Sequence, residues 1–265
     1  MDRAAARPAL PQFWEFVAPQ AWRSIDFIAD LHLQAFRPRT VAAFADHLRH
    51  TPADAVFILG DLFEAWVGDD ARHSGFESEV ADILQDAASY RCIAFMPGNR
   101  DFLLGTEMLR DCGILALADP TVLVACGERL LLTHGDALCL DDEAYQRFRT
   151  EVRADAWRHA FLARPLEQRR ALAAQMRDAS MQHQRAQAQE HWADVDEATA
   201  ARWMHEAGTP VLVHGHTHRP GNQPIAPGLL RMVLSDWEFD MGAPRADVLR
   251  LSRFGLERVA PARAG

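Results

Sequence analysis

The sequence predicts an α/β protein with a helical insertion, and three observations support this fold class. Short apolar runs alternate with stretches of helical character in the first half of the chain, as in βαβ units. Further apolar runs follow towards the C-terminal end, which makes a second sheet plausible. Between the two sets lies a block that is rich in Ala, Arg and Gln and almost free of β-branched residues, as expected of helices.

Four apolar runs are expected to be buried strands, and predicted helices separate the first three. The strands are SIDFIAD, DAVFILGD, RCIAFMPGN and PVLVHGH, and the helices are VAAFADHLRH and ESEVADILQDAAS. The segment TVLVACGERLLLTHGD predicts a hairpin that turns at Cys126-Gly127-Glu128. The tail segments LLRMVLSDW, ADVLRLS and GLERVA are expected to be further strands.

The insertion is expected to span residues 142–205, between core segments 25–141 and 206–265 and after an N-terminal arm of residues 1–24. In its first part, apolar residues at roughly helical spacing predict one amphipathic helix. These residues are Tyr145, Phe148, Val152, Trp157 and Phe161. Pro165 is expected to start a second helix. We therefore interpret the block as a cap on the core.

The composition excludes several classes of protein. The net charge is −9 and the basic residues are spread along the chain, which argues against a nucleic-acid partner. All 28 basic residues are arginines, so Schiff-base chemistry and a P-loop are excluded. The 4 cysteines are scattered, as expected of reduced thiols in a cytoplasmic protein. No segment approaches the length of a membrane span, and a signal peptide is not expected.

Five of the apolar runs end in residues of metal-binding type. The segments are Asp30-Leu31-His32, Gly60-Asp61, Gly98-Asn99-Arg100-Asp101, His134-Gly135-Asp136 and Gly215-His216-Thr217-His218. Each piece alone is weak evidence, because D-x-H is frequent by chance and G-D usually marks a turn. Strand ends in open α/β sheets meet at one edge, so we expect the five segments to form one site.

The chemistry of this set favours a transition-metal site. Carboxylates, one amide and several imidazoles suit Mn²⁺, Fe²⁺ or Zn²⁺, whereas Mg²⁺ and Ca²⁺ prefer oxygen ligands alone. The ligands outnumber what one ion with an open position needs, so we expect two ions that share a carboxylate. Such a pair clamps a phosphoryl group and acidifies a bridging water, which prepares an in-line attack on phosphorus.

The ordered set D-x-H, GD, GNRD, HGD and GHTH resembles the calcineurin-like metallophosphoesterases. The surrounding segments are similar to one branch of them, the UDP-2,3-diacylglucosamine pyrophosphatases of lipid A biosynthesis. These segments are FIADLHL, ILGDLFEAWVGDD, PGNRDFLLG, THGDALCLDDEAYQRFR and HGHTHRP. The resemblance covers nearly the whole chain outside the N-terminal arm. It implies a four-layer α/β/β/α sandwich with a helical cap insertion and a site for two Mn²⁺ ions.

The resemblance also implies roles for individual residues. Asp61 would bridge the two ions, one held by Asp30, His32, Asp61 and His218 and the other by Asp61, Asn99, His134 and His216. The residues implied to be catalytic are Asp61, Asn99, Arg100 and His134. Those implied to contact substrate are Asn99, Arg100, Asp142, Ser180 and His216. Asp142 is also a candidate helix N-cap, and His214 is expected to be buried support rather than a ligand.

The implied reaction is hydrolysis of UDP-2,3-diacylglucosamine at the α-phosphorus. It yields UMP and 2,3-diacylglucosamine 1-phosphate on the cytoplasmic side of the inner membrane. The cap would receive the acyl chains, and plain packing is an equal alternative for Trp157, Phe161 and Leu162. Shortly after the serine that Ser180 matches, the family carries an asparagine and a lysine. This chain has Gln184 and Gln187 there, with Arg185 as another source of charge.

Two other functions stay open. A dimetal phosphodiesterase or phosphatase for a smaller soluble nucleotide would need no apolar chamber. A catalytically silent scaffold would show broken ligand positions, and all seven are present. Peripheral attachment to a membrane is a further hypothesis, with a solvated helix surface as its alternative. It rests on arginines near apolar residues, namely Arg147, Arg153, Arg158, Arg164, Arg169 and Arg170.

Overall fold

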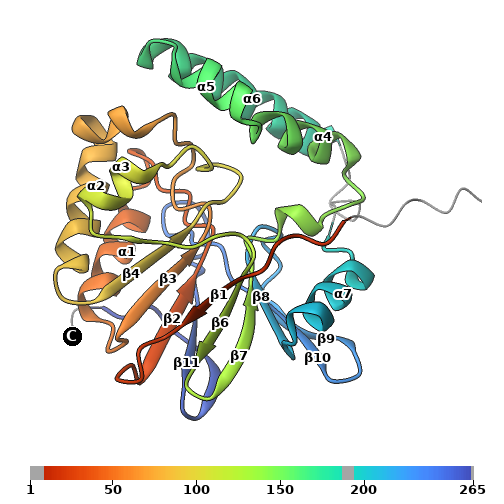
Figure 1. Cartoon of the computed structure of the whole chain (residues 1–265). Coiled ribbons are helices and arrows are strands. Elements are labelled where there is room, and N and C mark those ends of the chain that lie inside the picture. Colours follow the sequence, from red (N-terminus) through yellow and green to blue (C-terminus); the bar gives the residue numbers. More distant parts are fainter. Residues whose placement is uncertain (1–8, 187–193, 264–265) are drawn as a thin grey trace, which may run out of the picture.

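The computed structural model describes residues 9–186 and 194–263, which form two six-stranded sheets packed face to face. Helices α1 and α2 cover one outer face and α7 covers the other, so the layers run helix, sheet, sheet, helix (Figure 1). This arrangement confirms the predicted four-layer sandwich. A group of further helices lies across the top of both sheets in Figure 1, where the insertion was expected.

The first sheet has the strand order β12-β11-β2-β3-β4-β5. Its three central strands run parallel and are joined by helices, as the sequence predicts. The strands are β2 (Ser24–Ile28), β3 (Ala55–Leu59), β4 (Cys92–Met96), β5 (Leu115–Ala116), β11 (Val248–Ser252) and β12 (Gly255–Val259). The helices beside them are α1 (Pro38–His50), α2 (Gly75–Ala88) and α3 (Thr106–Asp111).

The second sheet has the order β1-β6-β7-β8-β10-β9. Its strands are β1 (Trp14–Val17), β6 (Thr121–Ala125), β7 (Glu128–Leu132), β8 (Val211–His214), β9 (Gly221–Ala226) and β10 (Leu229–Val233). The predicted hairpin of β6 and β7 is confirmed. Cys126 and Gly127 form its turn with φ of 54° and 84°, the left-handed conformation that two-residue hairpin turns require. From the expected arm, β1 adds an edge strand to this sheet.

Three apolar clusters hold the layers together. Phe27, Phe57 and Leu132 pack between the two sheets, where the central strands are buried on both faces. Alternate residues of the same strands, such as Ile58, face α1 and α2 instead. Helix α7 (Glu197–Ala207) packs its buried side against the second sheet, although it falls in the range predicted for the insertion. The boundaries expected for the insertion, residues 142 and 205, remain a prediction.

The cap begins with two helices where the sequence analysis expected one. Helices α4 (Glu143–Val152) and α5 (Asp155–Leu162) are separated at Arg153 and Ala154, and α6 (Leu166–Ala186) follows. The reason is visible in the spacing, because Val152 and Trp157 are five residues apart and cannot share one helical stripe. Pro165 directly precedes α6, as predicted.

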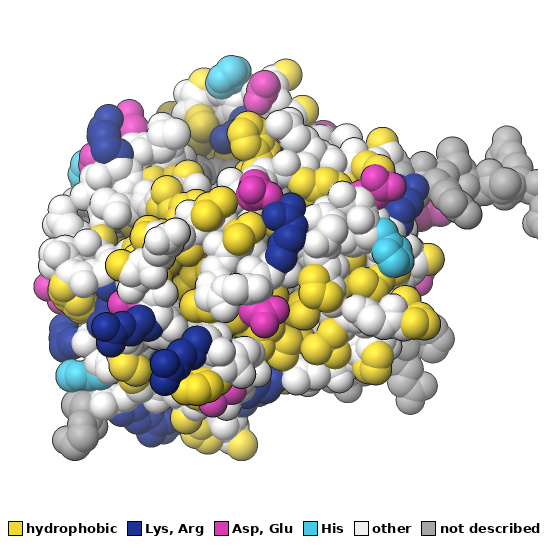
Figure 2. All heavy atoms as spheres, turned by 60° about the horizontal axis from the view of Figure 1, so that its bottom comes forward, with side chains coloured by type: hydrophobic (Ala, Val, Ile, Leu, Met, Phe, Trp, Pro, Cys, Tyr) yellow, Lys and Arg dark blue, Asp and Glu magenta, His cyan; other side chains and the backbone are white. Residues whose placement is uncertain are grey.

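Two of the arginines considered for a membrane-facing surface turn inwards instead. Arg169 is only 3% exposed, and its guanidinium binds the Asp70 carboxylate and the Arg164 carbonyl. Arg153 donates to the Gly98 carbonyl. Among the described residues, no helix is long and apolar enough to cross a membrane. On the face turned away from the cap, acidic and basic side chains are interspersed among apolar ones (Figure 2).

The buried His47 predicts a pH-dependent stability. Its ring is fully buried, its Nε2 lies 3.4 Å from Asp26 Oδ2, and burial lowers its pKa to about 4 against the opposing effect of Asp26. The unfolded chain therefore binds an extra proton between about pH 6.5 and 4. The free energy of unfolding should fall over that window as pH drops, by at most about 3 kcal/mol from this group.

Urea unfolding at several pH values checks this expectation. His47→Gln should flatten the pH dependence between pH 6.5 and 4, because the glutamine does not titrate. The control is His50→Gln, which replaces an exposed histidine of the same helix. Equal pH dependence in wild type and His47→Gln would contradict the assignment.

Candidate metal centre

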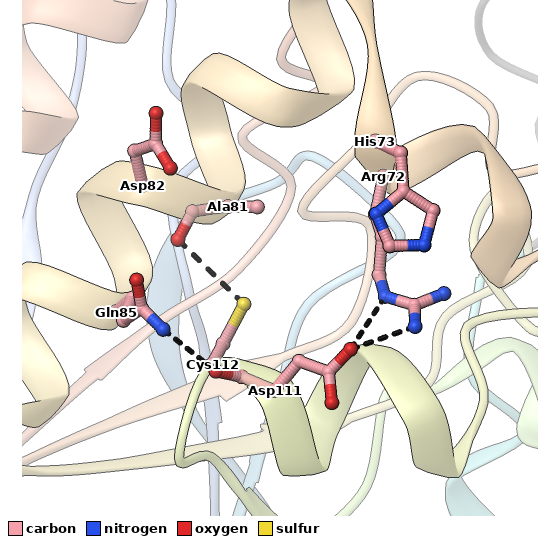
Figure 3. A pocket seen from close by; sticks show the side chains of 7 residues that line it. All are labelled: Arg72, His73, Ala81, Asp82, Gln85, Asp111 and Cys112. Carbon is pink, nitrogen blue, oxygen red and sulfur yellow. Dashed lines mark hydrogen bonds and ion pairs between the residues drawn. The ribbon is translucent and has the colours of Figure 1, made fainter.

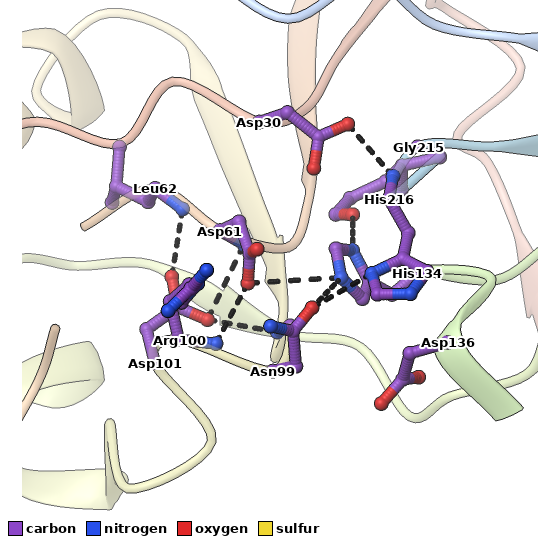
Figure 4. A network of polar contacts seen from close by, with 12 residues as sticks. Asp30, Asp61, Leu62, Asn99, Arg100, Asp101, His134, Asp136, Gly215 and His216 are labelled. Atoms are coloured by element: carbon purple, nitrogen blue, oxygen red, sulfur yellow. Dashed lines mark hydrogen bonds and ion pairs between the residues drawn. The ribbon is translucent and has the colours of Figure 1, made fainter. Parts of the chain in front are cut away.

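All seven predicted ligands converge beneath the cap, where strands of both sheets end (Figure 4 shows five of them). From the first sheet, Asp30 and His32 follow β2, Asp61 follows β3 and Asn99 follows β4. From the second sheet, His134 follows β7, and His216 and His218 follow β8. The convergence of strand ends therefore gathers residues that are up to 188 positions apart (from Asp30 to His218).

One group of ligand atoms comes from Asp30, His32 and His218, and these atoms lie within 4.8 Å of one another. The Nε2 atoms of His32 and His218 are 3.2 Å apart. Asp30 Oδ1 lies 3.7 Å from His218 Nε2 and, although buried, accepts no hydrogen bond from the described residues. A buried carboxylate oxygen facing two imidazole nitrogens fits a bound divalent cation.

A second group comprises Asp30, Asp61 and His134, so Asp30 is common to both groups. Asp61, a member of the second group, also lies close to a histidine of the first. Its Oδ1 is 3.6 Å from His134 Nε2, and its Oδ2 is 3.9 Å from His32 Nε2. Asn99 Oδ1 is 2.9 Å from His134 Nε2 and 2.8 Å from His216 Nδ1. The position of Asp61 is therefore that of a carboxylate able to bridge two ions.

The ligand loops share an unusual backbone conformation. Asp30, His32, Asp61, His216 and His218 all have positive φ, between 47° and 67°. Among the described residues, the only other non-glycine with positive φ is Cys126 in the hairpin turn. Left-handed backbone of this kind costs about 1–3 kcal/mol per residue and clusters at functional sites. The fold therefore places its strained residues at the ligand positions.

Glycines beside the ligands allow this close packing. A Cβ at Gly98 would lie 2.1 Å from Asp61 Oδ1, and a Cβ at Gly215 would lie 2.5 Å from Asp30 Oδ2. Both separations are far below van der Waals contact, so any other residue would displace a ligand carboxylate. The motif glycines are thus part of the site's geometry.

Asp101 shapes the loop that presents Asp61, a role that the sequence analysis did not assign. Its carboxylate accepts hydrogen bonds from four backbone N–H groups, at 2.8 Å from Gly98, 3.3 Å from Asp61, 2.7 Å from Leu62 and 3.3 Å from Phe63. Burial and the neighbouring Asp61 charge raise its pKa to about 7. The sequence did draw attention to Asp101, because it is the last residue of the GNRD motif.

Outer partners orient the ligand histidines. His134 Nδ1 donates to the Leu59 carbonyl at 2.9 Å, which leaves Nε2 free to bind a metal. His32 Nδ1 lies 3.2 Å from Glu64 Oε2, and Glu64 Oε1 lies 3.0 Å from Arg177 Nε on α6. Burial alone would raise the pKa of Glu64, but His32, Arg100 and Arg177 lower it to about 2. The sequence analysis gave Glu64 no role, although it lies in the FEAWVGDD segment.

The charges in the centre support one another. Burial would raise the pKa of Asp30, but His218, His134 and His32 hold it well below its usual value. Burial would lower the pKa of His134, yet Asp61, Asp136 and Asp30 raise it to about 9. The Asp30 carboxylate, held this strongly in the ionised form, attracts positive charge, which a divalent cation supplies.

The structure gives side-chain contacts for some of the residues predicted to bind substrate and not for others. Arg100 donates its backbone N–H to Asp61 Oδ1 at 2.8 Å, and its buried Nε has no hydrogen-bond partner among the described residues. Asp142 is the N-cap of α4 and accepts from the Tyr145 N–H at 2.9 Å. Ser180, Gln184 and Arg185 belong to α6, but their side chains lie outside the described residues, as does all of Gln187.

A second cluster joins the cap to the centre and was also missed. Asp136 is fully buried, and its Oδ2 accepts from Tyr145 Oη at 2.6 Å, Arg149 Nε at 2.8 Å and Arg153 at 3.1 Å. The HGD motif of the sequence contains Asp136, but it gives no indication that Tyr145, Arg149 and Arg153 bind this carboxylate. The Tyr145 ring lies 5.8 Å from that of His216. Helix α4 is therefore fixed directly against the metal centre.

A separate hollow of about 130 Å³ lies between the 3-10 helix η1 (Asp69–His73), α2 and α3 (Figure 3). Its side chains already bind one another or nearby backbone, as Arg72 binds Asp111 at 2.7 Å and Cys112 Sγ lies 3.6 Å from the Ala81 carbonyl. None of the predicted ligands lines it. Its small volume makes it unsuitable for a nucleotide sugar.

Residues 23–220 match the family model of the calcineurin-like phosphoesterases, and the chain belongs to this family. A UDP-2,3-diacylglucosamine hydrolase from Xanthomonas campestris is 43% identical over 87% of this chain and 96% of its own. A second, from Ralstonia nicotianae, is 43% identical over 85% of this chain and 88% of its own. A solved archaeal phosphodiesterase is 12% identical, covers 89% of this chain and 98% of its own, and has a TM-score of 0.44.

The position of Asp61 predicts that its removal empties more than one metal site. Asp61→Ala should lower the metal content after dialysis against buffer with a trace of Mn²⁺, because the variant lacks the carboxylate that lies within 4 Å of both His32 and His134. Elemental analysis measures the ions per chain. The control is Asp111→Ala, which removes a carboxylate paired with Arg72 in the separate hollow. Wild-type metal content in Asp61→Ala would contradict the bridging role.

Proposed function

We propose that this chain hydrolyses the pyrophosphate bond of UDP-2,3-diacylglucosamine at the α-phosphorus in lipid A biosynthesis. The products are UMP and 2,3-diacylglucosamine 1-phosphate. The observation that carries the proposal is the convergence of seven potential ligands, Asp61 among them, in a chain 43% identical to hydrolases of this substrate. Two Mn²⁺ ions are the proposed cofactors, because the mixed oxygen and imidazole set suits such an ion.

The two proposed ligand sets share Asp61. Asp30, His32, Asp61 and His218 would hold one ion, and Asp61, Asn99, His134 and His216 the other. Divalent ions held there supply Lewis-acid activation of a phosphoryl group and acidify a water molecule. The chain itself contributes orientation, because the Leu59 carbonyl directs His134 and the Asp101 carboxylate fixes the Asp61 loop.

Arg100 is the proposed phosphate-binding side chain. Its buried Nε has no hydrogen-bond partner among the described residues, and its backbone N–H keeps it beside Asp61. A guanidinium presents a planar fork of donors that matches two phosphate oxygens, so it can hold the pyrophosphate next to the ligands. Asn99, Asp142, Ser180 and His216 are proposed as the other substrate contacts. Asp142 would add this contact to its capping bond.

The cap is proposed to shield the acyl chains. Phe102, which follows the GNRD motif, lies 6.1 Å from Trp157 between ring centres, and Trp157 stacks on Phe161 at 4.8 Å. Phe161 is 5% exposed and joins the core cluster, so core packing accounts for this residue. Phe102 and Trp157 pack against the same cluster but are only partly buried, so both rings keep exposed surface, which favours a substrate with a long apolar part.

Substrate comparison tests the proposal. Purified chain should release UMP from UDP-2,3-diacylglucosamine with Mn²⁺ and lose that activity on exhaustive chelation. The kcat/KM should exceed that for UDP-glucose by about 100-fold or more, because each buried CH₂ contributes about 0.8 kcal/mol. Full activity after chelation would contradict the metal mechanism. Comparable kcat/KM on UDP-glucose would favour the enzyme for smaller soluble nucleotides.

We also propose that the protein attaches peripherally to the cytoplasmic side of the inner membrane through its cap. Phe148 and Leu162 are 39% and 37% exposed there, and the Arg147 side chain, which pairs with Glu143, is 72% exposed. Apolar side chains beside a basic one suit an anionic membrane surface. The inward-facing Arg153 and Arg169 take no part in this contact.

Sedimentation with anionic vesicles at low salt measures the attachment. Wild type should co-sediment, and the double change Phe148→Ser with Leu162→Ser should reduce the bound fraction severalfold, because it removes the apolar contact. The matched control is Met241→Ser with Phe254→Ser, two exposed apolar residues outside the cap. Wild type remaining in the supernatant, or equal loss in both double variants, would overturn this proposal.

A further inference from the structure

The ring of His214, the last residue of β8, is fully buried beneath the second sheet's outer layer. Its neighbours on the strand show the orientation, because Leu212 packs with α7 and Val213 packs between the sheets. Side chains alternate along a strand, so His214 points to the same side as Leu212, away from the first sheet. It is therefore no member of either ligand group, and its contacts must explain its presence.

Two hydrogen bonds fix the tautomer of this ring. Arg231 Nε donates to His214 Nε2 at 2.8 Å, and His214 Nδ1 lies 2.7 Å from the Gly215 carbonyl oxygen. A guanidinium can only donate and a carbonyl can only accept. The hydrogen must therefore be on Nδ1, which donates it to Gly215.

Arg231 is itself held from several directions. It is 1% exposed on β10, donates to Gln223 Oε1 on β9 at 3.1 Å and pairs with the Asp194 carboxylate. Asp194 is the first described residue after α6, where the chain returns from the cap. The guanidinium therefore has little freedom to leave His214, because moving it would break a buried ion pair.

The His214 ring contacts both the loop that carries His134 and the loop that carries His216. A Cβ at Gly135, next to His134, would lie 2.8 Å from His214 Nδ1. The Gly215 N–H donates to the His134 carbonyl at 3.0 Å, so the two loops are also bonded to each other. His134 and His216 both reach the same oxygen of Asn99.

We propose that His214 and Arg231 are positioning residues of the metal centre. Arg231 sets the tautomer of His214, and the Nδ1–H bond to Gly215 then holds the loop that presents His216 beside His134 and Asn99. The inference rests on the proposed dimetal site. It assigns the effect to the ion held by Asn99, His134 and His216, and not to the ion held by Asp30, His32 and His218.

Two substitutions of His214 separate this role from plain packing. The amide of His214→Asn reaches only the Nδ1 position, where it can still donate to Gly215. The amide of His214→Gln reaches the Nε2 position, where it accepts from Arg231 but leaves Gly215 without its donor. Each variant loses one hydrogen bond, so the melting temperatures of the metal-free proteins should fall similarly.

Calorimetric titration of the chelator-stripped chains with Mn²⁺ gives the decisive comparison. In His214→Gln one of the two ions should bind about 10–100-fold more weakly than in wild type, as for other losses of an outer partner. In His214→Asn both ions should bind within a few-fold of wild type. Unchanged binding in His214→Gln, or equal weakening in both variants, overturns the inference. A wild type that binds no Mn²⁺ overturns the proposed dimetal site instead.

The wild-type chain provides a second test that does not depend on a variant folding. Nitrogen-15 NMR distinguishes the two neutral tautomers of histidine by the shifts of the ring nitrogens. The His214 ring should show a protonated Nδ1 and an unprotonated Nε2. A hydrogen on Nε2 would overturn the inference directly.

Discussion

The buried carboxylates of Asp30 and Asp61 are the constraint around which the rest of this structure is arranged. They are 0% and 2% exposed, and an ionised carboxylate removed from water must be compensated by charge and hydrogen bonds. Imidazoles from the second sheet and backbone N–H groups of Arg100 and His216 supply that compensation, and the neighbouring glycines leave room for the carboxylates. Both sheets must therefore end at the same place, and the loops accept left-handed backbone to reach it.

Much of the fold was predictable because its causes are local. The buried central strands are continuous apolar runs, and the hairpin turn has a glycine at its second position. The ligand segments could be predicted because each follows a strand, and strand ends converge. The separation of α4 from α5 was also present in the sequence, in the five-residue step from Val152 to Trp157. The expectation of one helix ignored that step.

Other features depend on tertiary partners and could not be predicted from local pattern. Glu64 becomes important only because α6 brings Arg177 to it. Asp136 becomes important only because α4 and the residue after it place three donors on one oxygen. Arg153 and Arg169 carry the same sequence signal as the exposed Arg147, yet they bind inside the protein. The cap thus contacts the centre through Glu64 and Asp136.

The contact between Asp30 and His216 has a consequence for the stability of the whole molecule. Asp30 belongs to one sheet, and its Oδ2 accepts the backbone N–H of His216 from the other at 2.8 Å. A cation that neutralises this carboxylate therefore acts on the junction between the two halves of the sandwich. By mass action, an ion that binds only the native state raises the unfolding free energy as its concentration rises. Metal supply and protein lifetime are then coupled, and a metal-starved chain is exposed to unfolding as well as to loss of activity.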